Sequence, residues 1–433
     1  MPVPLLLGPW LLGSWLLGPL LLGSWLLGPL VLGRLVLLVA LPHGTTSSSS
    51  SPTQQPVPED GDRDTSVSFV TPGAPEGLGG CAPGQRAGVG AAVRAGTAEE
   101  RPGCPKRMVF GPCGGVRDDG SCELGAYPCV FLEPPLPRWT DPTPPAPLPP
   151  PGGLLERART GPVVLTDLTV RPFDPASVRA VVAALAPVSD GLLIGEHQNR
   201  PDLPPTLMAQ HVLAAGGRPW TTLACRDRNR VVLEQELAGL AAVGVDGVLC
   251  VTGDGRGPGV RPGVSSVFDL DGTRLAALAT AAGLTAAVPE SPDAPPVPLR
   301  PERVAGKERA GARLCVLNHV AGPARLAAFT AAARAAGATL PFLASVAVYT
   351  DEPSARVLQA FPGLHLDDAA VERVLAAPDP VAAGIEAAVR EARTVLAVPG
   401  VVGVNLSGLA SAGGPAAAAA VKAEVATRIR EGA

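Results

Sequence analysis

Short apolar runs alternate with Ala-rich amphipathic stretches from about residue 161 to the C-terminus. Each run is rich in β-forming residues and ends abruptly in polar ones, which is typical of strands in a parallel sheet. Most stretches between them have helical spacing, such as Asp174–Ala186, whose Asp-Pro start suits a helix N-terminus. Strands are predicted at Val163–Val170, Gly191–Glu196, Trp220–Cys225, Gly247–Thr252, Leu284–Pro289, Ala312–Asn318, Pro341–Val348 and Val401–Leu406.

This alternation predicts an α/β fold with a closed barrel. Eight strands and their helices in roughly 270 residues match the size of a (β/α)₈, or TIM, barrel. The rival is an open doubly wound sheet, which normally has fewer strands and a Gly-rich turn after the first one. The segment LTDLTVRPFD after the first predicted strand is no such turn. We therefore predict a TIM-barrel domain over residues 159–433.

Polar residues follow the predicted strands, and in a barrel these strand ends share one mouth, where ligands bind. The clearest unit is the strand–helix–strand segment 219–254, in which CRDRNR follows one strand and TGD the other. Many such residues cap helices or satisfy loop backbone instead. The Gly of TGD allows close backbone approach, so Asp254 is expected in the mouth. The candidates are Asp167, Glu196, Arg226, Asp227, Asp254, Glu290, Asn318, His319, Tyr349, Asn405 and Ser407.

Three motifs in this region resemble one family. CRDRNR with LAGLAAVGVDGVLCVTGD, then SSVFDLDGTRLAAL, then GKERAGARLCVLNH occur in order over about Val163–Leu364. Together they resemble the methylenetetrahydrofolate reductase barrel, a flavoprotein that reduces 5,10-methylenetetrahydrofolate to 5-methyltetrahydrofolate. The resemblance implies an oxidoreductase of one-carbon metabolism that binds FAD and a folate and takes electrons from NAD(P)H or a ferredoxin-type donor.

The resemblance also implies roles for individual residues. Asp167 is the candidate catalytic acid, although the family has glutamate at this position. The residues expected at FAD are Asp254, Lys307, Asp269, Asp271 and Thr222, and those expected at the folate are His319 and Asn318. His319 stands where the family has the pterin-binding glutamine. These departures leave a catalytically silent binding or scaffold subunit as an alternative, and a corrinoid- or folate-dependent methyltransferase barrel as a third.

Eight cysteines occur, and they are unevenly distributed. Those in the predicted strands, Cys225, Cys250 and Cys315, are expected to behave as small apolar residues. Four others crowd together upstream between Gly-Pro and Gly-Gly turns, a pattern that suits a tetrathiolate site for zinc or an iron–sulfur cluster; disulfides are the alternative. They are Cys104, Cys113, Cys122 and Cys129. The pattern C-P-K-x-M…GPCGG…G-x-C-E…C resembles the small cysteine-rich, metal-binding domain associated with methylenetetrahydrofolate reductases of some bacteria.

The N-terminal part contains no candidate chemistry. Residues 1–42 repeat a Leu-Leu-Gly pentad with no charge before Arg34, which indicates a mis-assigned start or a membrane anchor. Residues 43–75 read as a disordered linker, 76–135 as the cysteine-rich module, and 136–158 as a Pro-rich linker between module and barrel. We therefore expect a cytoplasmic protein, or one anchored to a membrane through residues 1–42.

Charge and composition narrow the partners. The net charge is −4, and no basic run with interleaved aromatic residues occurs, so nucleic acid is not expected as a partner. Gly (51) and Pro (50) approach a quarter of the 433 residues, and much of that excess lies in the two linkers. A homo-oligomer is expected.

Overall fold

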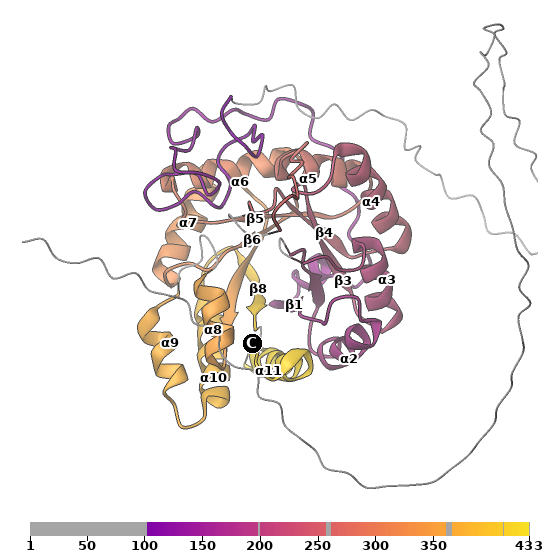
Figure 1. Cartoon of the computed structure of the whole chain (residues 1–433), viewed down its shortest axis with the longest axis vertical. Coiled ribbons are helices and arrows are strands. Elements are labelled where there is room, and N and C mark those ends of the chain that lie inside the picture. Colours follow the sequence, from indigo (N-terminus) through magenta and orange to yellow (C-terminus); the bar gives the residue numbers. More distant parts are fainter. Residues whose placement is uncertain (1–101, 198–199, 257–260, 361–365, 410, 433) are drawn as a thin grey trace, which may run out of the picture. The chain divides into compact units, whose positions relative to one another are not determined.

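Eight parallel strands close into a barrel in chain order, β1 to β8, in the computed structural model (Figure 1). The structure describes residues 102–432 apart from 198–199, 257–260, 361–365 and 410. The closed sheet confirms the predicted TIM barrel and excludes the open doubly wound sheet. All eight predicted strands are present, and each observed bound lies within two residues of the predicted one. The strands are β1 Val163–Leu168, β2 Gly191–Ile194, β3 Pro219–Ala224, β4 Gly247–Val251, β5 Ala286–Glu290, β6 Leu314–Leu317, β7 Phe342–Val348 and β8 Val401–Gly408.

Helices surround the strands, and local signals start and stop them where the sequence predicts. Asp174 accepts hydrogen bonds from the first free N–H groups of α2, and Asn229 does the same for α4. Gly244, with φ 78°, ends α4 in the left-handed conformation. The helices are α1 Leu154–Arg157, α2 Pro175–Leu185, α3 Pro205–Ala214, α4 Arg230–Val243, α5 Gly272–Ala281, α6 Arg300–Arg309, α7 Pro323–Ala335, α8 Glu352–Gln359, α9 Asp368–Leu375, α10 Pro380–Leu396 and α11 Gly414–Glu431, with a 3₁₀ turn η1 at Val297–Leu299.

The strands bury both faces, and alternate residues serve two cores. One set points outward against the helices, and it includes Cys225, Cys250 and Cys315, each 0% exposed, as predicted for apolar thiols. The other set fills the barrel interior with residues such as Leu165 and Trp220. Because the period along a strand is two, the inward positions are set once one of them is known. Near the C-terminal ends of the strands these inward positions become polar.

The floor of the barrel is closed by α1. Leu154 is fully buried against the inner core. The carboxylate of Asp246 accepts hydrogen bonds from Leu154 N at 2.9 Å and from Trp220 Nε1 at 2.8 Å. Asp246 therefore joins α1 to β3 beneath the barrel, at the end opposite the strand C-termini.

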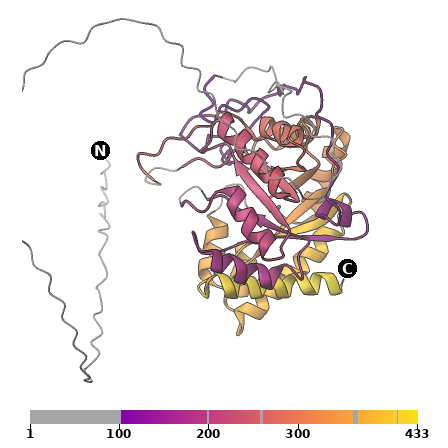
Figure 2. The same cartoon turned by 90° about the vertical axis from the view of Figure 1, so that its right-hand side faces the viewer.

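Residues at both ends of the Pro-rich stretch 136–158 are buried, Leu136 and Trp139 at one end and Leu154 at the other. The rings of Phe110 and Trp139 lie 5.2 Å apart. Residues 102–132, the cysteine-rich segment hereafter, run beside α5 and α6 in Figure 1, and Figure 2 shows the same segment against one side of the barrel. Both parts belong to one compact unit, Pro83–Ala433.

The predictions for residues 1–42 and 43–75, and for the first part of the cysteine-rich module, lie outside the described residues. Within the described ranges, no helix combines the length and the apolar character needed to cross a membrane.

Replacing Asp246 by alanine tests the floor of the barrel. The variant leaves the buried indole N–H of Trp220 and the N–H of Leu154 without their acceptor, so the free energy of unfolding should fall by on the order of 3 kcal/mol. Urea unfolding followed by tryptophan fluorescence measures this. The exposed Asp118→Ala is the control, and an equal loss in both variants would contradict the assigned role.

Candidate functional site

A cavity of about 440 Å³ opens at the C-terminal ends of the strands. This volume falls within the range of roughly 300–1,000 Å³ that is usual for small-molecule sites. Apolar side chains of the inner core, including Leu193, Leu249 and Val316, form part of its wall. Asp227 and Tyr349 do not line this cavity, but eleven other residues predicted for the mouth or the site do: Asp167, Glu196, Thr222, Arg226, Asp254, Glu290, Lys307, Asn318, His319, Asn405 and Ser407.

Asp167 lies in β1 and faces the barrel interior. Burial raises the pKa of its carboxyl, while the charge of Lys422, the Asn405 side chain and the N–H of Gly408 act in the opposite direction. Its Oδ1 has no hydrogen-bond partner in the described part of the protein. The carboxyl therefore keeps a buried oxygen without a partner in the described part of the protein, at a position where its proton affinity is raised.

His319 lies just beyond β6, and its Nε2 is 2.7 Å from Ser407 Oγ in β8. The imidazole is 3% exposed, and burial lowers its pKa to about 4, so the ring is neutral at pH 7. Its Nδ1 has no hydrogen-bond partner among the described residues, and neither has Oδ1 of Asn405. Asn318 is held by a 2.9 Å bond from its Nδ2 to Ser291 Oγ.

The carboxylate of Glu290, at the end of β5, is 1% exposed and meets three cations of α6. Arg300 Nη1 is 3.1 Å from Oε1, and Lys307 Nζ and Arg303 Nε are 2.8 and 3.6 Å from Oε2. Burial by itself raises the pKa of Glu290, but Lys307, Arg303 and Arg300 outweigh it and hold the pKa at about 2. The cluster keeps an excess of positive charge next to the cavity.

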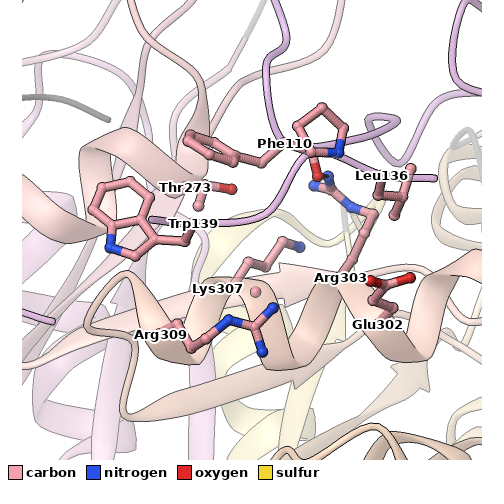
Figure 3. Close-up of a pocket in the computed structure, with 10 residues that line it drawn as sticks. Phe110, Leu136, Trp139, Thr273, Glu302, Arg303, Lys307 and Arg309 are labelled. Carbon is pink, nitrogen blue, oxygen red and sulfur yellow. Dashed lines mark hydrogen bonds between the residues drawn. The ribbon is translucent and has the colours of Figure 1, made fainter. Parts of the chain in front are cut away.

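The same cations fasten the cysteine-rich segment to the barrel. Arg303 Nη1 donates to Phe110 O at 2.9 Å, and Arg300 Nη2 donates to Cys113 O at 2.9 Å. Figure 3 shows Arg303 and Lys307 extending from α6 toward the chain that carries Phe110. The small cleft drawn there has a volume of about 10 Å³, roughly the space for one water, so it is a packing seam rather than a ligand site.

Asp254 and its turn are gripped by the cysteine-rich segment. Lys106 Nζ donates to Gly253 O at 2.7 Å and also pairs with Glu123, whose Oε2 accepts the N–H of Gly255 at 3.0 Å. Gly253 has φ 91°, and a Cβ there would lie 2.9 Å from that of Arg226, so the predicted close approach is observed. Burial raises the pKa of Asp254, and Lys106 lowers it. Sequence reasoning missed Lys106 and Glu123, because no local pattern places them at the mouth.

Asp269 and Asp271 do not line the cavity. Asp271 is fully buried and accepts hydrogen bonds from Thr273 N and Arg274 N as the N-cap of α5, and from Val109 N. Asp269 accepts the N–H of Arg230 at 2.8 Å. Both carboxylates satisfy backbone donors, and their contact with a cofactor stays a prediction.

The four upstream cysteines line a second, smaller cavity of about 20 Å³. Cys104 and Cys122 both act electrostatically on Cys129, whereas Cys113 Sγ lies 3.2 Å from Glu123 Oε1. In the described ranges, no three His, Cys, Asp or Glu side chains are arranged to hold a metal ion. Zinc or an iron–sulfur cluster at the four cysteines stays a prediction.

The chain was compared with known proteins. No protein-family model matches it, and no curated protein matches it. Among solved structures, it is similar to oxaloacetate acetylhydrolase (14% identity over 57% of this chain and 75% of that one, TM-score 0.36). It is also similar to 2,3-dimethylmalate lyase, a PEP mutase/isocitrate lyase superfamily member (13%, 61% and 81%, 0.38), and to tryptophan synthase from M. tuberculosis (14%, 66% and 98%, 0.36). Scores this low assign no activity to this chain.

The predicted FAD-dependent reduction of methylenetetrahydrofolate, with its oxidoreductase class, finds no support in these comparisons and is withdrawn: no family model matches the chain, and the similar folds carry other names. Lys307, expected at FAD, lines the cavity and is also bound to Glu290 and the Pro289 carbonyl, whereas Asp271 caps a helix. Binding of a folate, an electron donor or a second copy of the chain stays a prediction.

Replacing Glu290 by glutamine tests how much the carboxylate stabilises the fold by neutralising the three cations. Three buried cations lose their shared counter-ion, so the free energy of unfolding at pH 7 should fall by about 3–5 kcal/mol. Because the pKa of Glu290 is lowered, its stabilisation is present above its ordinary pKa of 4.5 and is lost as the pH falls toward 2. The difference between the variant and the unaltered chain should therefore shrink below pH 4.5 in urea unfolding. Glu302→Gln, which breaks an exposed pair with Arg138, is the control and should cost under about 1 kcal/mol.

Proposed function

We propose that this chain is an enzyme that binds a small anionic organic molecule at the barrel mouth and moves a proton to or from it. One observation carries the proposal. Three buried polar atoms have no hydrogen-bond partner among residues 102–432 as far as these are described, and all three belong to residues that line the same cavity: Asp167 Oδ1, His319 Nδ1 and Asn405 Oδ1. Buried hydrogen-bonding atoms nearly always have a partner, so a polar ligand or water is the group that completes them.

Asp167 is the proton-transfer group in this proposal. Burial raises the pKa of the Asp167 carboxyl, which makes it a stronger base than an ordinary aspartate. The bond from Asn405 and the N–H of Gly408 orient one side of the carboxyl and leave Oδ1 for the substrate.

Neutral His319 supplies a hydrogen bond rather than a charge. When Ser407 Oγ donates to Nε2, the imidazole proton is on Nδ1, which then donates to a substrate oxygen. A neutral imidazole that donates in this way stabilises negative charge that develops on a carbonyl oxygen as a proton leaves the adjacent carbon. Asp167 accepts that proton and returns it, so no redox change is needed.

The charge of the substrate follows from the Glu290 cluster. One carboxylate faces Arg300, Arg303 and Lys307, and two of these cations, Arg303 and Lys307, line the cavity. A carboxylate or phosphate on the ligand would balance the excess charge and accept directional hydrogen bonds. The proposed substrate class is therefore a small acid with a C–H bond next to a carbonyl group.

Solvent deuterium exchange tests this function. The purified chain is incubated in D₂O with pyruvate or 2-oxobutyrate, and loss of the C3 proton signal is followed by ¹H NMR. Exchange above the background rate is expected, and Asp167→Asn, which keeps the shape but loses the base, should slow it by about 10²-fold or more. Asp118→Asn is the exposed control and should leave the rate unchanged. Exchange at the background rate for both acids, or equal rates in both variants, would refute the proposed proton transfer.

A further inference from the structure

A lysine from the outer helix layer reaches the strand that carries Asp167. Lys422, in α11, is 1% exposed. Its Nζ donates to the main-chain oxygen of Asp167 at 2.8 Å and to Thr169 Oγ1 at 3.4 Å. Asp167 and Thr169 both line the cavity, whereas Lys422 does not. The ammonium therefore sits directly behind the cavity wall.

The charge of Lys422 acts on Asp167 above all. Among the described residues, Asp167 is the titratable group whose charge raises the pKa of Lys422. No described carboxylate lies close enough to form an ion pair with the Lys422 ammonium. Charged groups on the surrounding elements pair among themselves: Arg428 with Glu386 of α10, and Arg430 with Asp190. On the neighbouring strand β8, the groups that face Asp167 are the neutral Asn405 side chain and the N–H of Gly408.

We propose that Lys422 is a positioning residue that favours the ionised carboxylate of Asp167 and orients it through the β1 backbone. This inference rests on the proposed function, since it assigns Lys422 a part in preparing Asp167 as a base. A hydroxyl or amide would satisfy the Asp167 carbonyl as well, without the cost of burying a charge. The presence of a lysine at this position is therefore better explained by its charge than by the hydrogen bond that it donates.

The balance of forces at the pair agrees with this role. Burial lowers the pKa of Lys422 to about 8 while Asp167 raises it, so the ammonium form still predominates at pH 7. Burial raises the pKa of Asp167 while Lys422 lowers it. Each charge offsets part of the desolvation cost of the other, as expected for opposite charges in a low-dielectric environment.

The test is to remove the charge while keeping a donor. In Lys422→Gln, the amide can still donate to the Asp167 carbonyl, so a role limited to that hydrogen bond would survive. The chain is made with ¹³Cγ-labelled aspartate, and the Asp167 signal is assigned by its loss in Asp167→Asn. The titration midpoint of Asp167 should rise by at least about one pH unit in Lys422→Gln, a tenfold change in proton affinity. Lys422→Arg keeps the charge, and its midpoint should stay close to that of the unaltered chain.

Activity and titration separate the two proposals. The rate of deuterium exchange should increase with pH as Asp167 ionises. In Lys422→Gln, this increase should occur at a higher pH, shifted by the same amount as the titration midpoint of Asp167. An unmoved midpoint in folded Lys422→Gln protein, checked by circular dichroism, overturns this inference whatever the activity. Where Lys422→Gln does not fold, Lys422→Met is measured in its place and judged by the same midpoint. A raised midpoint without any exchange in the unaltered chain would instead refute the proposed proton transfer and leave the Lys422–Asp167 coupling supported.

Discussion

The buried carboxylate of Glu290 is the contact on which the rest of the site depends. It lies at the end of β5 and forms ion pairs with three cations of α6: Arg300, Arg303 and Lys307. Two of these cations also hold backbone carbonyls of the cysteine-rich segment. A single desolvated charge thus sets the position of a strand end, a helix and the segment that borders the cavity. It also leaves a positive potential at the mouth, because three cations share one anion.

The polar layer at the mouth forms because the eight strands close into a barrel, so that their inward-facing residues meet in layers. Lower inward positions such as Leu165 and Trp220 pack against one another and need no partners. At the mouth the same alternation presents Asp167, Ser345, Asn405 and Ser407 instead. Among the described residues, Asp167 Oδ1 and Asn405 Oδ1 have no hydrogen-bond partner, which distinguishes a binding surface from a core. The fold thereby supplies an apolar base under these polar groups.

Motif residues can have two roles that sequence neighbourhood does not separate. Asp271 and Asp269 stand in a motif that implies a cofactor contact, and both accept backbone N–H groups. An aspartate before a helix is as well suited to capping as to ligand binding, and sequence spacing does not distinguish the two. Lys307 lines the cavity as the sequence predicts, and its neutralisation by Glu290 involves a residue seventeen positions away along the chain.

The sequence by itself determined the barrel. Eight apolar runs with helical stretches between them specify strand–helix units, and their polar ends specify the face on which Asp167, Asp254, Asn318 and His319 meet. Such signals are local, because strand period, helix caps and turn glycines act over a few residues. Only the tertiary structure decided that Lys106 and Glu123 grip the turn before Asp254, that Glu290 neutralises Lys307, and that Lys422 lies behind Asp167. These contacts join residues from 17 to 255 positions apart, and burial and charge at such distances are set by packing, which no local pattern encodes.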